Sequence, residues 1–151
     1  MSQCLLPVIA MFAVVLAGPA MFADEARNIE QLGELNESYV HAFNGHDPVN
    51  IGKLFVADGD YMLVTGDLLE GTEAIVAGHA SFFSNNPKVK LEGKVLKRKF
   101  LTPDLVLSHG KWKATGGPPG VPNEGTWTAI QVHADGQWRY QTIRVSVPLK
   151  F

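Results

Sequence analysis

Residues 24–47 read DEARNIEQLGELNESYVHAFNGHD. The apolar residues of this segment recur every three or four positions and its acidic residues fall on another face, which is the spacing of an amphipathic helix. The apolar positions are Ile29, Leu32, Leu35, Tyr39, Val40 and Phe43. Because Gly45 can adopt the left-handed conformation that ends a helix, we predict a helix from Asp24 to Asn44.

A second, shorter helix is predicted directly after the first. Asp47 can cap its N-terminus, and Pro48 suits the first helical position. This helix would carry Ile51, Leu54 and Phe55 inward and end at a turn formed by residues 58–59.

A hairpin and a third helix follow. Residues 60–66 and 68–70 are predicted to form two strands joined by a turn at Gly66. Thr72 is expected to cap the third helix, which would end at residues 85–87. The inward stripe of that helix would comprise Ile75, Val76, His79, Phe82 and Phe83.

From residue 88 onward the hydrophobic period changes to two, as in strands. The predicted strands are residues 88–101, 105–115, 126–134 and 137–147. A Gly- and Pro-rich excursion at 116–125, which could serve as a lid or a dimer arm, and a hairpin turn at 135–136 connect them. This order predicts one α+β domain over residues 24–151, with three N-terminal helices packed on a curled antiparallel sheet that encloses a cavity.

The first twenty residues differ in kind from the rest of the chain. Residues 5–17 carry no charge, and small residues follow up to Ala20, which is typical of a secretory signal cleaved after Ala20, or alternatively after Ala23. The apolar run is shorter than the roughly 20 residues that span a bilayer. We therefore expect a secreted or periplasmic protein without a stable membrane anchor. The single cysteine, Cys4, would be removed with the signal, so thiol chemistry is not expected.

The charge balance gives no support for a nucleic-acid partner. The net charge is −2 and the pI is near 6.2, whereas binding to phosphates requires clustered basic residues. One basic cluster exists, and it comprises Lys88, Lys90, Lys94, Lys97, Arg98 and Lys99. Because it falls in a predicted strand with almost no interleaved aromatic residues, we interpret it as a solvated strand face.

Several motifs resemble one superfamily. They are residues 39–47 (YVHAFNGHD), 100–104 (FLTPD), 125–128 (GTWT) and 135–139 (DGQWR). Together they resemble the SnoaL-like branch of the nuclear transport factor 2-like superfamily, and within it the SgcJ/EcaC group of exported proteins. The resemblance covers essentially the whole mature chain and implies a cystatin-like cone with a pocket. It does not imply one reaction, because the superfamily includes isomerases, polyketide cyclases, dehydratases, dioxygenase subunits and non-catalytic association domains.

One activity of the superfamily can be compared residue by residue. Its ketosteroid isomerases carry a tyrosine in the first helix and a catalytic aspartate in the first strand. Tyr39 matches the tyrosine, but the aspartate position falls at Met62 or Leu63, and neither side chain can transfer a proton. The resemblance therefore does not extend to this mechanism.

Three residues are candidates for the chemistry of the pocket. His79 lies on the inward stripe of the third helix, and a buried imidazole can act as an acid or a base near neutral pH. Tyr39 lies on the first apolar stripe, where its hydroxyl can reach a polar partner. Arg144 is expected on the same strand face as Tyr140, where it could bind a carboxylate. The alternatives are a satisfied core histidine, a packed core tyrosine and a structural ion pair.

Further candidates for ligand contact lie in the predicted strands. They are Tyr61, His109, Trp127 and Gln131, of which Trp127 and Gln131 share one face. The pattern leaves open whether Tyr61, His109 and Trp127 face the cavity or the outside of the sheet. No histidine shows metal-ligand spacing with another histidine or a carboxylate. The chain also lacks a phosphate-binding glycine loop and a nucleophile elbow, so we predict no metal and no cofactor.

Two functional hypotheses follow from the predicted fold. The apolar strand residues Trp112, Trp127, Val132, Ile143 and Val145 exceed what one cavity requires, so we expect a homodimer packed through the sheet. The first hypothesis is an exported protein that binds a small apolar or carboxylate-bearing molecule, with acid/base turnover of the isomerase, cyclase or dehydratase type. The alternative is a non-catalytic homodimeric association module.

Overall fold

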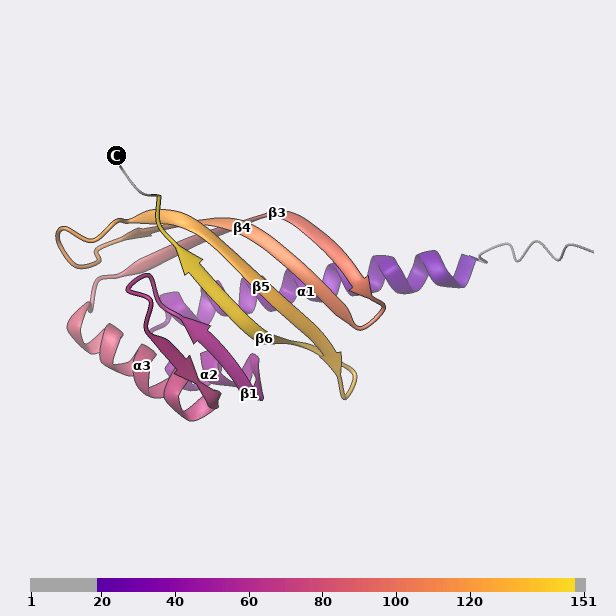
Figure 1. Ribbon diagram of the computed structural model, residues 1–151, viewed down its shortest axis with the longest axis horizontal. Coiled ribbons are helices and arrows are strands. Elements are labelled where there is room, and N and C mark those ends of the chain that lie inside the picture. The colour runs from indigo at the N-terminus through magenta and orange to yellow at the C-terminus, as the bar shows by residue number, and fades with distance from the viewer. Residues whose placement is uncertain (1–18, 149–151) are drawn as a thin grey trace, which may run out of the picture.

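The computed structural model describes residues 19–148, which form three helices and one six-stranded sheet (Figure 1). The helices are α1 (Pro19–Asn44), α2 (Pro48–Lys53) and α3 (Gly71–Asn85). The strands are β1 (Phe55–Met62), β2 (Leu68–Glu70), β3 (Lys90–Thr102), β4 (Leu105–Thr115), β5 (Glu124–Ala134) and β6 (Gln137–Ser146). Most of the predicted signal segment lies outside the described residues, whereas both expected cleavage points fall within α1. None of the helices in residues 19–148 is long and apolar enough to cross a membrane.

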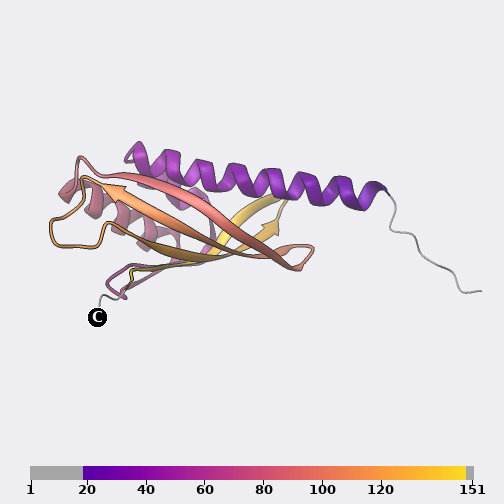
Figure 2. The same ribbon diagram turned by 90° about the horizontal axis from the view of Figure 1, so that it is seen from above.

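The sheet is mixed, and the prediction of a purely antiparallel sheet is wrong at one pair of strands. The strand order is β2-β1-β6-β5-β4-β3, and β1 pairs with β6 in parallel, whereas the other neighbours are antiparallel. Only a tight turn forces two strands to run antiparallel, and β1 and β6 are joined by most of the chain rather than by a turn. Figure 2 shows α1 lying along one face of the curled sheet.

Strand β1 begins five residues earlier than predicted. Residues 58–59, which we expected to form a turn, lie inside β1, where the pairing with β6 shifts between Phe55 and Asp60. Such a β-bulge accommodates extra residues within a strand. A Cβ atom at Gly59 would lie 3.0 Å from the carbonyl oxygen of Val56 and 3.2 Å from that of Tyr140. The glycine is therefore required by close backbone approach rather than by a turn.

The start of α3 also differs from the prediction. Glu70 occupies the N-cap position without a side-chain capping bond, so Thr72 lies inside the helix. Instead of capping the helix, the Thr72 hydroxyl donates a hydrogen bond to the carbonyl of Val56 at 3.4 Å. The helix begins early because Gly71, with a φ of 81°, turns the chain directly out of β2. In α2, Asp47 caps the helix as predicted and accepts a bond from the backbone N–H of Asn50 at 2.9 Å.

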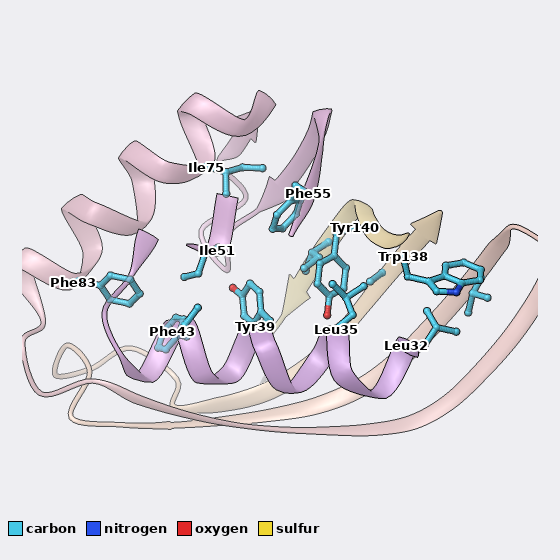
Figure 3. Close-up of a cluster of buried hydrophobic side chains, with 14 of the residues drawn as sticks. Leu32, Leu35, Tyr39, Phe43, Ile51, Phe55, Ile75, Phe83, Trp138 and Tyr140 are labelled. Carbon is cyan, nitrogen blue, oxygen red and sulfur yellow. The ribbon is translucent and has the colours of Figure 1, made fainter. Parts of the chain in front are cut away.

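The core lies between α1, the two other helices and the concave face of the sheet. Leu32, Leu35, Tyr39 and Phe43 of the predicted α1 stripe are buried, whereas Ile29 at its start is 46% exposed. Figure 3 shows these side chains meeting residues of α2, α3, β1 and β6. Burying a large apolar side chain contributes about 1.5–3 kcal/mol, so this stripe fixes α1 against the sheet.

A β-bulge in β3 changes which side chains face inward. The pairing of β3 with β4 shifts between Val95 and Lys97, so Leu96 is an extra residue without a partner in β4. Before the bulge Val95 faces inward, and after it Arg98 does. Leu96 itself is 49% exposed.

A second bulge changes the phase of β6. Ile130 pairs with Thr142 and Gln131 pairs with Tyr140, which leaves Gln141 as the extra residue. Tyr140 and Ile143 are therefore both buried on the concave side although three positions separate them. Regular alternation would have placed them on opposite faces.

Candidate functional site

A cavity of about 940 Å³ lies between α1, α3 and the concave face of the sheet. Residues 63–64 after β1 and most of the 116–123 segment between β4 and β5 also line it. Most of the lining surface is apolar, and polar side chains are interspersed in it. Ligand sites commonly combine these two properties. The cavity is therefore the candidate site among residues 19–148.

His79 and Tyr39 meet on the wall of this cavity. The Tyr39 hydroxyl lies 3.2 Å from His79 Nε2, and His79 Nδ1 lies 2.8 Å from the carbonyl oxygen of Ile75. Because a carbonyl can only accept, Nδ1 carries the proton in the neutral ring and Nε2 presents its lone pair to Tyr39. Helical spacing places Ile75 one turn before His79, so α3 itself fixes this tautomer.

Burial holds both groups neutral. It lowers the pKa of His79, an effect that the bond to the Ile75 carbonyl partly opposes. It also raises the pKa of Tyr39 well above its usual value, and the neighbouring phenol of Tyr61 adds to that shift. A neutral imidazole beside a neutral phenol can exchange a proton with a ligand without first losing a charge.

Aromatic rings enclose the pair. Tyr61 stacks on Tyr39 with ring centroids 6.5 Å apart and meets His79 edge-on at 5.1 Å. Phe43 and Phe83 contact the imidazole at centroid distances of 6.4 Å and 6.0 Å. Burial also raises the pKa of Tyr61. This apolar surround is the physical cause of the neutral state of His79.

A second polar pair, Tyr140 and Asn36, lies nearer the N-terminus of α1 than Tyr39 does. The Tyr140 hydroxyl donates to Asn36 Oδ1 at 2.9 Å, and both residues line the cavity. Tyr140 contacts Tyr39 edge-on at a centroid distance of 6.0 Å, so the Tyr140–Asn36 pair is next to the Tyr39–His79 pair. Figure 3 shows the Tyr140 side chain pointing toward α1. Burial raises the pKa of Tyr140, while the positive charge of Arg98 opposes that increase.

Arg98 does not belong to a solvated strand face, and that interpretation of the basic cluster is wrong at this residue. Its guanidinium lines the cavity, is partly buried and donates to the carbonyl of Leu32 at 3.1 Å. Lys97 and Lys99 are exposed, as predicted. The difference comes from the bulge at Leu96, which turns position 98 inward.

Arg144 lies outside the cavity, contrary to the expectation that it shares a face with Tyr140. Its guanidinium pairs with Asp60 and contacts the Thr142 hydroxyl. The hydrogen bond from Arg144 lowers the pKa of Asp60, while partial burial of Asp60 acts in the opposite direction. The bulge at Gln141 is the cause, since it turns position 144 to the outer face. The structural ion pair, one of our two alternatives, is what the structure contains.

The other predicted contact residues are divided between the two faces. Tyr61 and Trp127 line the cavity. His109 is exposed outside it and lies 3.1 Å from the Thr128 hydroxyl. Gln131 is fully buried beneath the lining, where it accepts a hydrogen bond from the Ser108 hydroxyl.

The tryptophans lie flat over glycines of neighbouring strands. A Cβ atom at Gly110 would come within 2.4 Å of the Trp127 ring, and one at Gly125 would come within 2.8 Å of Trp112 Nε1. Both indoles line the cavity, as do Ile143 and Val145. Of the five apolar residues that we assigned to a dimer interface, only Val132 is therefore outside the cavity lining.

Sequence reasoning missed Asn36 and Tyr140 as site residues, besides Arg98. Asn36 lies three residues before Tyr39 on α1, so helical spacing could have placed it on the same wall. Tyr140 was predicted to lie in a strand, but its contacts with Asn36 and Tyr39 depend on how β6 pairs with its neighbours, which the sequence does not reveal. Within residues 19–148, no group of three or more His, Cys, Asp or Glu side chains is arranged to hold a metal ion.

Comparison with solved structures identifies the fold. LinA superposes with a TM-score of 0.73 at 14% identity, over 85% of this chain and 93% of that chain. A putative scytalone dehydratase from Novosphingobium aromaticivorans gives 0.71 at 13% identity, over 87% and 92%. A domain of unknown function with a cystatin-like fold from Nostoc punctiforme gives 0.71 at 19% identity, over 85% and 79%. The protein has this cystatin-like fold.

The expected cystatin-like fold is therefore confirmed. No protein-family model matches the sequence. No curated protein matches it either. At these identities the likeness concerns the fold alone, and the chemistry has to be argued from the side chains.

Proposed function

We propose that the cavity binds a small, mostly apolar molecule and transfers a proton on it, with His79 as the base and Tyr39 as the hydrogen-bond donor. The hydrogen bond between the Tyr39 hydroxyl and His79 Nε2 on the cavity wall carries this proposal. The size of the cavity, about 940 Å³, supports binding of a small molecule rather than a filled core.

The proposed chemistry is proton abstraction next to a carbonyl group. A carbonyl oxygen that accepts a hydrogen bond from Tyr39 replaces His79 as the partner of that hydroxyl, which frees the Nε2 lone pair. Nε2 then takes a proton from the adjacent carbon while Tyr39 stabilises the developing enolate oxygen. The raised pKa of Tyr39 keeps the phenol protonated for this role. Isomerisation, cyclisation and dehydration can all begin with this step.

Deuterium exchange tests the proposal without knowledge of the natural substrate. The protein is incubated in D₂O with aryl ketones such as propiophenone, and mass spectrometry follows deuterium incorporation next to the carbonyl. We expect wild-type protein to accelerate exchange and His79→Gln to lower the rate roughly 100-fold. His133→Gln is the matched control, because His133 pairs with Asp104 outside the cavity. Equal exchange rates in His79→Gln and wild type would show that His79 is not the base.

The rival hypothesis is a non-catalytic association module that assembles through the outer face of the sheet. Partly buried apolar residues on that face, Leu107, Ile130 and Val132, support a homodimer, although fewer residues are available than the sequence suggested. Sedimentation at micromolar concentration tests the dimer. A dimer that binds no small molecule would favour the rival, whereas a monomer that binds ligand would leave only the pocket hypothesis.

Export and subgroup membership are also part of the proposal. The apolar run at residues 5–17 supports export, and the motifs quoted above support membership of the SgcJ/EcaC group. Native mass spectrometry of protein from the exported fraction, followed by denaturing mass analysis, measures the mature terminus, the oligomer and any retained ligand. An intact mass that includes residues 1–20 would contradict signal cleavage.

A further inference from the structure

We propose that Arg98 forms an anion-binding subsite in the cavity and holds the carboxylate of the molecule on which His79 acts. This inference rests on the proposed function, because it assigns a chemical class to the ligand of that same cavity. It also transfers to Arg98 the role that the sequence had suggested for Arg144.

The first observation is that the Arg98 guanidinium is incompletely partnered. One terminal nitrogen donates to the Leu32 carbonyl at 3.1 Å, and the buried Nε has no hydrogen-bond partner in the structure. No ion pair within residues 19–148 includes Arg98. Burial of a charged donor without a partner is costly, and a guanidinium has five donors to satisfy. An anionic ligand in the cavity would supply the missing acceptor.

The second observation is the charge of the cavity lining. The lining contains two cationic side chains, Arg98 and Lys94, and one carboxylate, that of Glu37. Glu37 is exposed and lies outside ion-pair distance of Arg98. The positive excess therefore remains available to a ligand. A planar carboxylate suits a guanidinium because both can form two parallel hydrogen bonds.

The third observation is the separation between Arg98 and the proposed base. Arg98 is fixed to Leu32, and Tyr39 lies seven residues further along α1. At 1.5 Å per residue, the backbone positions of Leu32 and Tyr39 are about 10 Å apart along the helix axis, and the bond to the Leu32 carbonyl therefore places Arg98 toward the N-terminal side of Tyr39. The wall between them carries Asn36 and Tyr140. The predicted ligand therefore has a carboxylate at one end and its reacting carbon at the other.

Matched ligand pairs test the subsite. Aryl-substituted alkanoic acids of increasing chain length are each compared with their neutral primary amides by isothermal titration calorimetry. The acid and the amide of a pair share shape but differ in charge. We expect the acids to bind roughly tenfold more tightly than the amides, with the largest ratio at one chain length.

The variants separate Arg98 from general charge effects. Arg98→Gln should abolish the preference for the acid, whereas Lys97→Gln should keep it. Lys97 is the matched control, because it lies one residue away on the exposed side of β3 and its loss changes the net charge equally. If Arg98→Gln fails to fold, Arg98→Lys serves instead and should weaken acid binding several-fold without changing amide binding. His79→Gln should leave the acid-to-amide ratio unchanged.

Each other outcome contradicts a defined part of the hypothesis. Equal affinity of wild-type protein for acids and amides would overturn the anion subsite and leave the pocket function standing. An acid preference that survives in folded Arg98→Gln, or acid binding that is unaffected in Arg98→Lys, would also exclude Arg98 as its source. Failure of wild-type protein to bind either series would reject the small-molecule pocket and, with it, the subsite.

Discussion

Two arginines of the same sheet have opposite environments because two β-bulges set their faces. In β3 the extra residue Leu96 turns Arg98 toward the cavity, and in β6 the extra residue Gln141 turns Arg144 toward the outer face. Regular alternation counted from Val95 or from Tyr140 would have exchanged the two faces.

The consequences for hydrogen bonding are different. Arg144 is paired within the protein with the carboxylate of Asp60 and also contacts the hydroxyl of Thr142. Arg98 finds one backbone carbonyl and retains a buried Nε without an acceptor. The comparison shows that one residue type can be structural on one face and available for ligand binding on the other. Bulges commonly re-aim side chains near functional sites in this way.

Deleting a residue from a regular strand should break the arrangement most severely. Strand β5 lies inside the sheet, between β4 and β6. If Ile130 is removed, the residues on one side of the deletion shift by one position, so their inward-facing side chains turn outward and their outward-facing side chains turn inward. We expect a loss of more than about 4 kcal/mol in the free energy of unfolding, measured by urea denaturation. A stability near that of wild type would mean that β5 does not depend on its register.

Closing the space beside the β6 bulge should have a smaller effect. In Gly59→Ala the new Cβ would lie 3.2 Å from the carbonyl oxygen of Tyr140 and 3.3 Å from that of Gln141. These are backbone atoms, which cannot easily move away. We expect a loss of about 2 kcal/mol, from the midpoint of urea unfolding. Gly33→Ala in α1 is the control, since its Cβ meets no atom within 4 Å and should stabilise the helix by up to about 1 kcal/mol. Equal effects of the two substitutions would contradict the role assigned to Gly59.

Deletion of the bulged residue Leu96 should be tolerated better than deletion of Ile130. Val95 would then be followed by Lys97 facing outward and Arg98 facing inward, so the normal alternation keeps Arg98 in the cavity. Because β3 is an edge strand and Leu96 is half-exposed, we expect a cost of about 1 kcal/mol. Calorimetry with the acid and amide pairs should show an unchanged preference for the acid. Loss of that preference would show that the bulge itself, rather than the facing of Arg98, is required.

Removing the partner of Arg144 should have the smallest effect. Asp60→Asn should cost no more than about 1 kcal/mol at neutral pH, because both side chains of the pair are partly exposed. The pKa of Asp60 is lowered in the folded protein, so its contribution is complete above the unfolded pKa and is lost as the pH falls through the folded value. The stabilities of wild type and Asp60→Asn should therefore begin to converge as the pH falls below about 4. A stability difference that persists in acid would assign the effect to packing.

The helical part of the site could be predicted from the sequence, whereas the strand part could be predicted only in part: Tyr61 and Trp127 line the cavity, but the two arginines were misassigned. A helix keeps its phase over its whole length, so the stripes of α1 and α3 place Tyr39 and His79 on inward faces without further information. A strand loses its phase at every bulge, and neither Leu96 nor Gln141 carries a side-chain signal that marks a bulge. For this reason Arg144 was assigned to the cavity, whereas Arg98 was assigned to the solvent together with the rest of its basic cluster.

The strand boundaries show the same limit. Residues 58–59 have the composition of a turn, yet they lie in the bulge of β1. The bulge is set by the pairing with β6, a strand far away in the sequence, and local composition does not reveal that pairing. The parallel pairing of β1 with β6 is likewise a long-range property with no local signature. By contrast, the hairpins β3–β4 and β5–β6 depend on turns a few residues long and were placed correctly.

The two indoles that lie over Gly110 and Gly125 give the protein a built-in optical signal. Trp112 and Trp127 line the cavity, whereas Trp138 is buried at a distance from it, against Phe100 and His133. A ligand that enters the cavity therefore changes the surroundings of two of the three fluorophores and leaves the third as an internal reference. Phe substitution at Trp138 would isolate the responsive pair, so occupancy could be followed by emission from the unlabelled protein.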